Sequence, residues 1–188
     1  MKLGLITSIC EGMTFEEVVD FAAENGLECL EVACWPQGGA NRRYAGVSHI
    51  DVSDLTEAKA KEIKDLCAKK GVEISALAYY PNTMDPDLEK RAGYIAHLYK
   101  LIDASAMLDV NMVTTFVGRD PKKNVSENLE LVKEVWPPIV KYAEEKGVKI
   151  AIENCPMLFT EDEWPGGQNL MTSPANWRKI FEIIDSPN

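Results

Sequence analysis

Three glycines at matching places in the chain constrain its fold more than any other feature. They lie in the segments ENGLE, KKGVE and EKGVK, each between an amphipathic stretch and a short β-branched stretch, at Gly26, Gly71 and Gly147. A glycine there supplies the left-handed conformation that ends a helix before the next strand begins. Asp109 lies 38 residues after Gly71 and 38 before Gly147. We therefore expect Asp109 to end a helix in the same conformation, which Asp tolerates less well than Gly.

Short β-rich segments alternate with longer amphipathic ones between these turns. The strand candidates are Lys2–Thr7, Cys29–Ala33, Glu73–Tyr79, Met112–Val117 and Val148–Glu153. The helix candidates are Phe15–Asn25, Leu55–Lys70, Asp87–Leu108, Ser126–Lys146 and Pro174–Ile184. Thr14 with Glu17 and Asp54 with Glu57 predict capping boxes, and Ser173 predicts an N-cap before a proline at the first helical position.

Repeated βα units of this size predict right-handed crossovers and a parallel sheet covered by helices. Such a sheet either stays open and doubly wound or closes into a (β/α)₈ barrel. No G-x-G-x-x-G follows a strand candidate, which argues against a dinucleotide-binding sheet and favours the α/β TIM barrel. The repeat places a sixth strand just after Asp185, so we expect residues 1–188 to be a single domain, the first five of eight βα units. The whole protein would then have about 280 to 320 residues.

Charge and composition narrow the choice of partners. A net charge of −10 disfavours a nucleic acid, because phosphate contacts need clustered Lys and Arg. No apolar run approaches the roughly 18 residues that span a bilayer, and the first residues, MKLGLITS, are too few for a signal peptide. We expect a cytoplasmic protein with no membrane partner and a small soluble substrate. The five cysteines contain no CxxC pair, which predicts reduced structural thiols.

In a TIM barrel the chemistry lies at the carboxyl ends of the strands. The residues expected there are Thr7, Ser8, Glu11, Cys34, Trp35, Tyr79, Tyr80, Asn82, Phe116, Glu153, Asn154 and Cys155. Aromatic rings with amides and carboxylates suit a polyhydroxylated ligand, because sugar C–H faces stack on rings and hydroxyls take fixed hydrogen bonds. Each aromatic could equally close the top of the core, and Asn82 could be only a turn residue. We expect Glu11 to lie at the solvated start of the first helix.

Glu153 ends the strand in VKIAIENCP, whose apolar residues predict burial on both faces. An unpaired buried charge costs several kcal/mol, so this carboxylate is expected to be paired, protonated or bound to a metal. The chain has two histidines and neither lies at a strand end. A complete His-rich metal site therefore cannot be assembled from this chain. We expect His49 to hold the long loop after the second strand, and His97 to be structural or exposed.

Four segments together resemble the sugar phosphate isomerase/epimerase family of the xylose isomerase-like TIM barrel superfamily: ISALAYYPN, VTTFVGRD, AIENCP and WPGGQNLMTSPANW. The resemblance implies a divalent metal, commonly Mn²⁺ or Mg²⁺ and in some members Zn²⁺ or Co²⁺. Its ligands would be Glu, Asp, His and Glu at the ends of strands five to eight, of which only Glu153 corresponds within this chain. The resemblance also implies that Glu153 exchanges a proton with the substrate carbon while the metal polarises the neighbouring carbonyl.

The same resemblance implies a substrate pocket lined by Trp35, Tyr80, Asn82, Phe116, Asn154, Trp164 and Asn169. The activity it implies is a metal-dependent isomerase or epimerase of a sugar or related keto-polyol, acting through an enediolate. One carboxylate alone gives little affinity for a hard cation, so we expect the full activity to require the remaining strands.

Two alternatives to the isomerase remain open. One is a dehydratase of the inosose dehydratase type, and the other is a non-catalytic sugar-binding half-barrel completed by forming a homo-oligomer. The endonuclease branch of the superfamily is disfavoured by the negative charge and by the lack of histidine at Ala33–Trp35 and Ala78–Asn82. No phosphate-binding Gly-rich loop occurs, and the segment GRD at Gly118–Asp120 offers only Arg119 to a phosphate.

Overall fold

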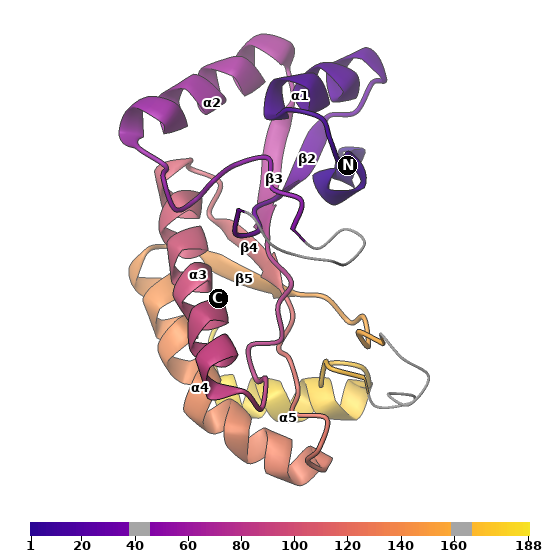
Figure 1. The fold of residues 1–188 in the computed structure, drawn as a ribbon, viewed down its shortest axis with the longest axis vertical. Coiled ribbons are helices and arrows are strands. Elements are labelled where there is room, and N and C mark those ends of the chain that lie inside the picture. Colours follow the sequence, from indigo (N-terminus) through magenta and orange to yellow (C-terminus); the bar gives the residue numbers. More distant parts are fainter. Residues whose placement is uncertain (38–45, 159–166) are drawn as a thin grey trace. The chain divides into compact units, whose positions relative to one another are not determined.

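The computed structural model describes residues 1–37, 46–158 and 167–188, and in this part of the chain strands alternate with helices (Figure 1). The strands are β1 Gly4–Ile6, β2 Cys29–Ala33, β3 Glu73–Ala78, β4 Met112–Thr115 and β5 Lys149–Ile152. The α-helices are α1 Phe15–Glu24, α2 Glu57–Lys70, α3 Leu88–Met107, α4 Val125–Glu145 and α5 Pro174–Ile184, with a 3₁₀ turn η1 at Thr7–Ile9. The strands follow one another in the sheet in chain order, and the β1–β2 and β2–β3 ladders are parallel.

The described residues group into two compact units. The N-terminal unit comprises Met1–Tyr79 and Lys100–Val113, and the C-terminal unit comprises Tyr80–Tyr99 and Thr114–Asn188. A single domain over residues 1–188 stays a prediction. None of the helices in the described ranges has both the length and the apolar character needed to cross a membrane.

The helix ends follow the predicted repeat. Gly26, Gly71 and Gly147 have φ angles of 70°, 70° and 69°, and Asp109 has a φ of 58°. Asp185 ends α5 with a φ of 41°, at the position that the repeat predicts for the next turn. The spacing of these turns therefore identified the βα units correctly.

Two predicted helix starts are confirmed and one is wrong. Thr14 and Glu17 form the capping box of α1, and Ser173 accepts a hydrogen bond from Asn176 N at the start of α5. The predicted box of Asp54 with Glu57 does not form, because Thr56 lies nearer the first turn and its hydroxyl caps α2. Asp54 instead pairs with Lys59 at 2.5 Å.

The strands β1 and β4 are shorter than predicted for different reasons. After Ile6 the chain turns into η1, where Cys10 N donates to Thr7 O, so the extended conformation ends there. The predicted end of β4 at Val117 is wrong because side chains occupy its carbonyl. Thr83 Oγ1 donates to Val117 O at 2.8 Å and Trp136 Nε1 donates to it at 3.0 Å.

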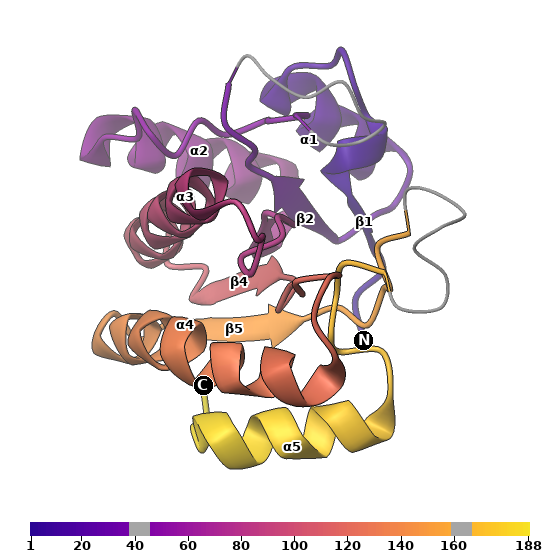
Figure 2. The same cartoon turned by 60° about the horizontal axis from the view of Figure 1, so that its bottom comes forward.

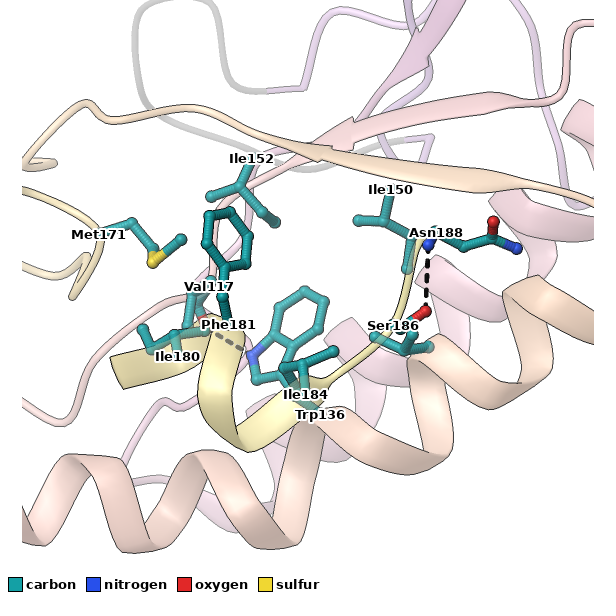
Figure 3. Close-up of a pocket in the computed structure, with 11 residues that line it drawn as sticks. Val117, Trp136, Ile150, Ile152, Met171, Ile180, Phe181, Ile184, Ser186 and Asn188 are labelled. Carbon is teal, nitrogen blue, oxygen red and sulfur yellow. Dashed lines mark hydrogen bonds between the residues drawn. The ribbon is translucent and has the colours of Figure 1, made fainter. Parts of the chain in front are cut away.

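In the C-terminal unit, α4 and α5 lie alongside β5 (Figure 2). An apolar cavity of about 70 Å³ lies between these three elements, and the side chains of Trp136, Ile152 and Phe181 line it (Figure 3). Ile150 lines the same cavity. Because successive side chains of a strand point to opposite faces, Ile150 and Ile152 face the helices and Glu153 belongs to the opposite face.

The predicted burial of β5 on both faces is wrong. Ile150, Ala151 and Ile152 are only half-buried, and Glu153 is exposed. The strand is last in the sheet order and has β4 as its one neighbouring strand among the described elements. Local apolar character predicted a strand correctly but could not show how many strands flank it.

Candidate functional site

Hydrogen bonds join four loop segments of the C-terminal unit, which follow β3, β4 and β5 or precede α5. The segments are residues 80–84 after β3, 115–120 at the end of β4, 153–156 after β5, and 167–171 before α5. We call this the strand-end network. It contains Glu153 and five of the seven predicted pocket residues, Tyr80, Asn82, Phe116, Asn154 and Asn169.

Asn82 connects the first two segments. Its Oδ1 accepts hydrogen bonds from Arg119 N at 2.8 Å and Met84 N at 3.1 Å, and its Nδ2 donates to Arg119 O at 2.7 Å. The side chain is buried, and both of its polar atoms are engaged. The amide therefore fixes the backbone of Arg119, and its contact with substrate stays a prediction.

Gly118 allows the Asn82 side chain to lie close to the backbone of the 115–120 segment. Its φ is +83°, and a Cβ there would overlap Asn82 Oδ1 and lie 2.9 Å from Met84 N. A larger residue would have to displace the amide that holds Arg119. Glycine at this position follows from the packing as well as from the left-handed backbone.

Glu153 begins the third segment and is hydrogen-bonded to the second and the fourth. Its backbone N donates to Thr115 O at 3.1 Å, and its carbonyl accepts from Asn169 Nδ2 at 3.0 Å. Asn169 is completely buried and also donates to Cys155 O at 2.7 Å. The network thus fixes the backbone of Glu153 on both sides while its carboxylate stays exposed.

The predicted aromatic residues form two separate pairs. Tyr80 and Phe116 pack with ring centroids 4.7 Å apart in the C-terminal unit, and Trp35 and Tyr79 pack edge-on at 4.9 Å in the N-terminal unit. Asn154 is exposed beside Glu153. Trp164 lies outside the described residues.

At the strand ends of the N-terminal unit, polar side chains form hydrogen bonds with backbone groups of the same unit. The buried Thr7 hydroxyl accepts from Ala33 N at 2.9 Å. His49 Nε2 lies 3.3 Å from Cys10 O, just after η1, so His49 holds the loop after β2 as predicted, and partial burial lowers the pKa of His49. Burial also raises the pKa of the Cys34 thiol. His97 is buried within α3, which is in line with a structural role.

The described residues do not by themselves complete a metal site. Within residues 1–37, 46–158 and 167–188, no group of three or more His, Cys, Asp or Glu side chains is arranged to hold a metal ion. Glu153 offers one exposed carboxylate, the ligand type that Mg²⁺ and Mn²⁺ prefer. It is the first ligand that the resemblance implies.

The family of the chain follows from comparison with known proteins. The model of the xylose isomerase-like TIM barrel family matches residues 19–188. The chain belongs to this family. The match confirms the resemblance of the strand-end segments and the α/β TIM barrel class, with five βα units in the described chain.

The chain spans only part of the relatives that it matches. It is 26% identical over 147 residues to the uncharacterized protein YfiH of Bacillus subtilis (strain 168), covering 75% of this chain and 44% of that protein. The probable 3-DHS dehydratase AsbF of Bacillus anthracis has a TM-score of 0.67 at 19% identity, with 100% of this chain and 61% of AsbF covered.

Two other solved structures share the fold. D-psicose 3-epimerase of Clostridium cellulolyticum H10 has a TM-score of 0.64 at 17% identity, with 96% of this chain and 60% of the epimerase covered. The IOLI protein with a bound zinc atom has a TM-score of 0.68 at 15% identity, with 99% of this chain and 60% of that protein covered. At these identities the similarity shows the fold alone.

Proposed function

We propose that the complete protein is an isomerase or epimerase of a sugar or related keto-polyol, with Glu153 as the group that moves the proton. The observation that carries the proposal is the exposed carboxylate of Glu153 at the carboxyl end of β5, on a backbone fixed by Thr115 and Asn169. A catalytic base needs a fixed position and access to the substrate. Glu153 has both.

The proposed reaction begins when the Glu153 carboxylate takes a proton from the carbon next to the substrate carbonyl. The electrons of the broken C–H bond move onto the carbonyl oxygen and give an enediolate. Return of a proton to the opposite face of that carbon gives the epimer, and its delivery to the neighbouring carbon gives the isomer. Both products retain every atom of the substrate.

The substrate would contact the predicted pocket residues in different ways. The Tyr80–Phe116 pair offers ring faces to the C–H surface of a sugar, and Trp35, Asn154 and Trp164 are proposed as further contacts. Asn82 and Asn169 are proposed to act mainly by holding Arg119 and Glu153 in place, because their amide groups are already engaged.

A divalent metal is proposed for the complete protein and not for the described residues alone. Mn²⁺ or Mg²⁺ suits the carboxylate of Glu153, and the zinc in the IOLI structure supports Zn²⁺ as an alternative. Within the described residues, Glu153 is the one ligand that the resemblance implies.

A second candidate is a dehydratase, which the similarity to the probable 3-DHS dehydratase AsbF supports. In this reaction the same enediolate expels the hydroxyl group on the next carbon as water, so the product has lost one water molecule. The two candidates share Glu153 as the base and differ only in the second step.

NMR in D₂O distinguishes these functions. The complete protein would be incubated with Mn²⁺ or Mg²⁺ and with D-fructose, D-tagatose, L-ribulose and D-fructose 6-phosphate in turn. An isomerase or epimerase gives products that carry deuterium at the reacting carbon and retain all hydroxyl groups, whereas a dehydratase gives loss of water. Binding of sugars with neither outcome would refute both enzyme proposals and leave the non-catalytic sugar-binding protein.

A further inference from the structure

Arg119 carries an unsatisfied hydrogen-bond donor at the end of β4. Its Nε is buried and has no hydrogen-bond partner among the described residues. Buried donors are almost always paired, because an unpaired one loses its hydrogen bond to water without compensation. An arginine held in this state is suited to receive an acceptor from a ligand.

The acidic residue next to Arg119 in sequence, Asp120, is engaged within its own turn. The buried Asp120 carboxylate accepts a hydrogen bond from Lys122 N at 3.0 Å, and its other oxygen lies 4.0 Å from Lys123 Nζ. Asp120 thus stabilises its own turn. Among the described residues no ion pair to Arg119 is found, in a chain with a net charge of −10.

Arg119 belongs to the same strand-end network as Glu153. Asn82 bonds both the N–H and the carbonyl of Arg119. The carbonyl of the preceding Gly118 accepts from Leu170 N at 3.0 Å, and Asn169, the residue just before Leu170, donates to the carbonyl of Glu153. A short series of hydrogen bonds therefore connects the backbone of Arg119 to that of Glu153.

We propose that Arg119 binds an anionic group of the substrate, a carboxylate or a phosphate, so that the substrate is a sugar acid or a sugar phosphate and not a neutral sugar. The planar guanidinium presents its donors as a fork that matches the oxygens of either anion. Its fixed backbone would place the anion while Glu153 acts on the carbonyl end of the same molecule. This inference rests on the proposed function.

Binding measurements on the complete protein test this assignment. The probes are D-fructose 6-phosphate, D-gluconate and D-fructose, and the readout is the ¹⁵N–¹H signal of Arg119 Nε together with the dissociation constant. We expect an anionic probe, but not D-fructose, to shift this signal. Whether the phosphate or the carboxylate probe binds more tightly identifies the anion.

Three variants define the expected result. Arg119→Gln should weaken the binding of the anionic probe by about 10- to 100-fold, the usual effect of losing a hydrogen bond between charged groups. Arg119→Lys should recover part of this loss, because it keeps the charge without the fork. Lys122→Gln, an exposed charge change in the same loop, should alter the affinity by less than about twofold.

Unchanged anion affinity in Arg119→Gln, or an equal loss in Lys122→Gln, would overturn the assignment. An unfolding curve of each variant separates lost binding from lost folding, and Arg119→Lys provides the test if Arg119→Gln does not fold. Anion binding at Arg119 without deuterium exchange into any substrate would refute the proposed function but not the anion site. Rapid exchange into neutral sugars, with no preference for anionic ones, would refute the anion site but not the proposed function.

Discussion

The strand ends of the two units differ in what they leave unsatisfied. In the N-terminal unit, the Thr7 hydroxyl bonds Ala33 N, and the buried Tyr79 packs against Trp35. In the C-terminal unit, neutral amides hold the backbone while Glu153 stays exposed and Arg119 Nε lacks a partner. The N-terminal unit leaves an imidazole nitrogen, His49 Nδ1, unpaired, whereas the C-terminal unit leaves a guanidinium nitrogen unpaired and Glu153 exposed.

This difference suggests that some residues hold the backbone in place while others contact the ligand. The amides of Asn82 and Asn169 are buried and fully engaged, so they can fix backbones without carrying charge. Of the two charged residues that they position, Glu153 is exposed and Arg119 has an unpaired Nε. Variants of Asn82 and Asn169 should therefore affect binding and stability together, whereas variants of Thr7 should affect stability alone.

The largest effect on stability is expected for Gly118→Ala. The new Cβ would overlap Asn82 Oδ1 and force alanine into a left-handed backbone, and these two costs together amount to about 3 kcal/mol. Gly147→Ala is the matched control, because Gly147 has a φ of +69° and nothing within 4 Å of its Cβ position. It should lose only about 1 kcal/mol in urea unfolding. Equal losses would show that Gly118 does not hold the network.

The next largest effect is expected for Asn82→Ala. This change removes three hydrogen bonds and leaves the backbone of Arg119 unpaired, which should cost about 2 kcal/mol in thermal unfolding. It should also weaken binding of an anionic sugar, since Arg119 loses its position. Asn25→Ala, which removes a single exposed hydrogen bond, should cost about 0.5 kcal/mol. Normal anion binding by Asn82→Ala would contradict the positioning role.

A smaller effect, confined to stability, is expected for Thr7→Val in the N-terminal unit. The buried Ala33 N would lose its acceptor, which should cost about 1 to 2 kcal/mol in the free energy of unfolding. Thr7→Ser keeps the hydroxyl and should lose less. Neither variant should change substrate or anion affinity, and a change in affinity would show that the strand ends of this unit also contact the ligand.

The smallest effect concerns pH and His49. Burial lowers the pKa of His49 in the folded protein, so between the folded value and the ordinary value of about 6.5 the unfolded chain binds more protons. Stability therefore rises with pH in this window and falls on acidification below about 6.5. The stability difference between wild type and His49→Gln, measured by urea unfolding at several pH values, should shrink as the pH falls. A constant difference would contradict this assignment.

Local patterns predicted most of the fold. Helix ends such as Gly71 and caps such as Thr14 depend on neighbouring residues, so the sequence shows them directly. The burial of β5 depends on which strands flank it, and the sequence of the strand itself does not show this. The capping box of Asn124 with Glu127 was missed although NVSE carries its signal.

The candidate site was predictable only in part. Glu153 and Arg119 could be found because each is a charged residue just after an apolar strand. The hydrogen bonds from Asn82 to Arg119 and from Asn169 to Glu153 join residues 37 and 16 positions apart. An amide in a loop carries no local sign of such a partner, so the structure was needed to find what positions the charged groups.

The central claim is that the Glu153 carboxylate moves the substrate proton. Its most direct test is the rate of deuterium exchange from D₂O into a sugar substrate, catalysed by the complete protein and by Glu153→Gln. Glu130→Gln serves as the control, because Glu130 is an exposed residue of α4 that pairs with Lys133. We expect the exchange rate of Glu153→Gln to fall by about 10² to 10⁴-fold with an unchanged unfolding curve, and that of Glu130→Gln to stay at the wild-type level. Exchange by Glu153→Gln at close to the wild-type rate would contradict the claim.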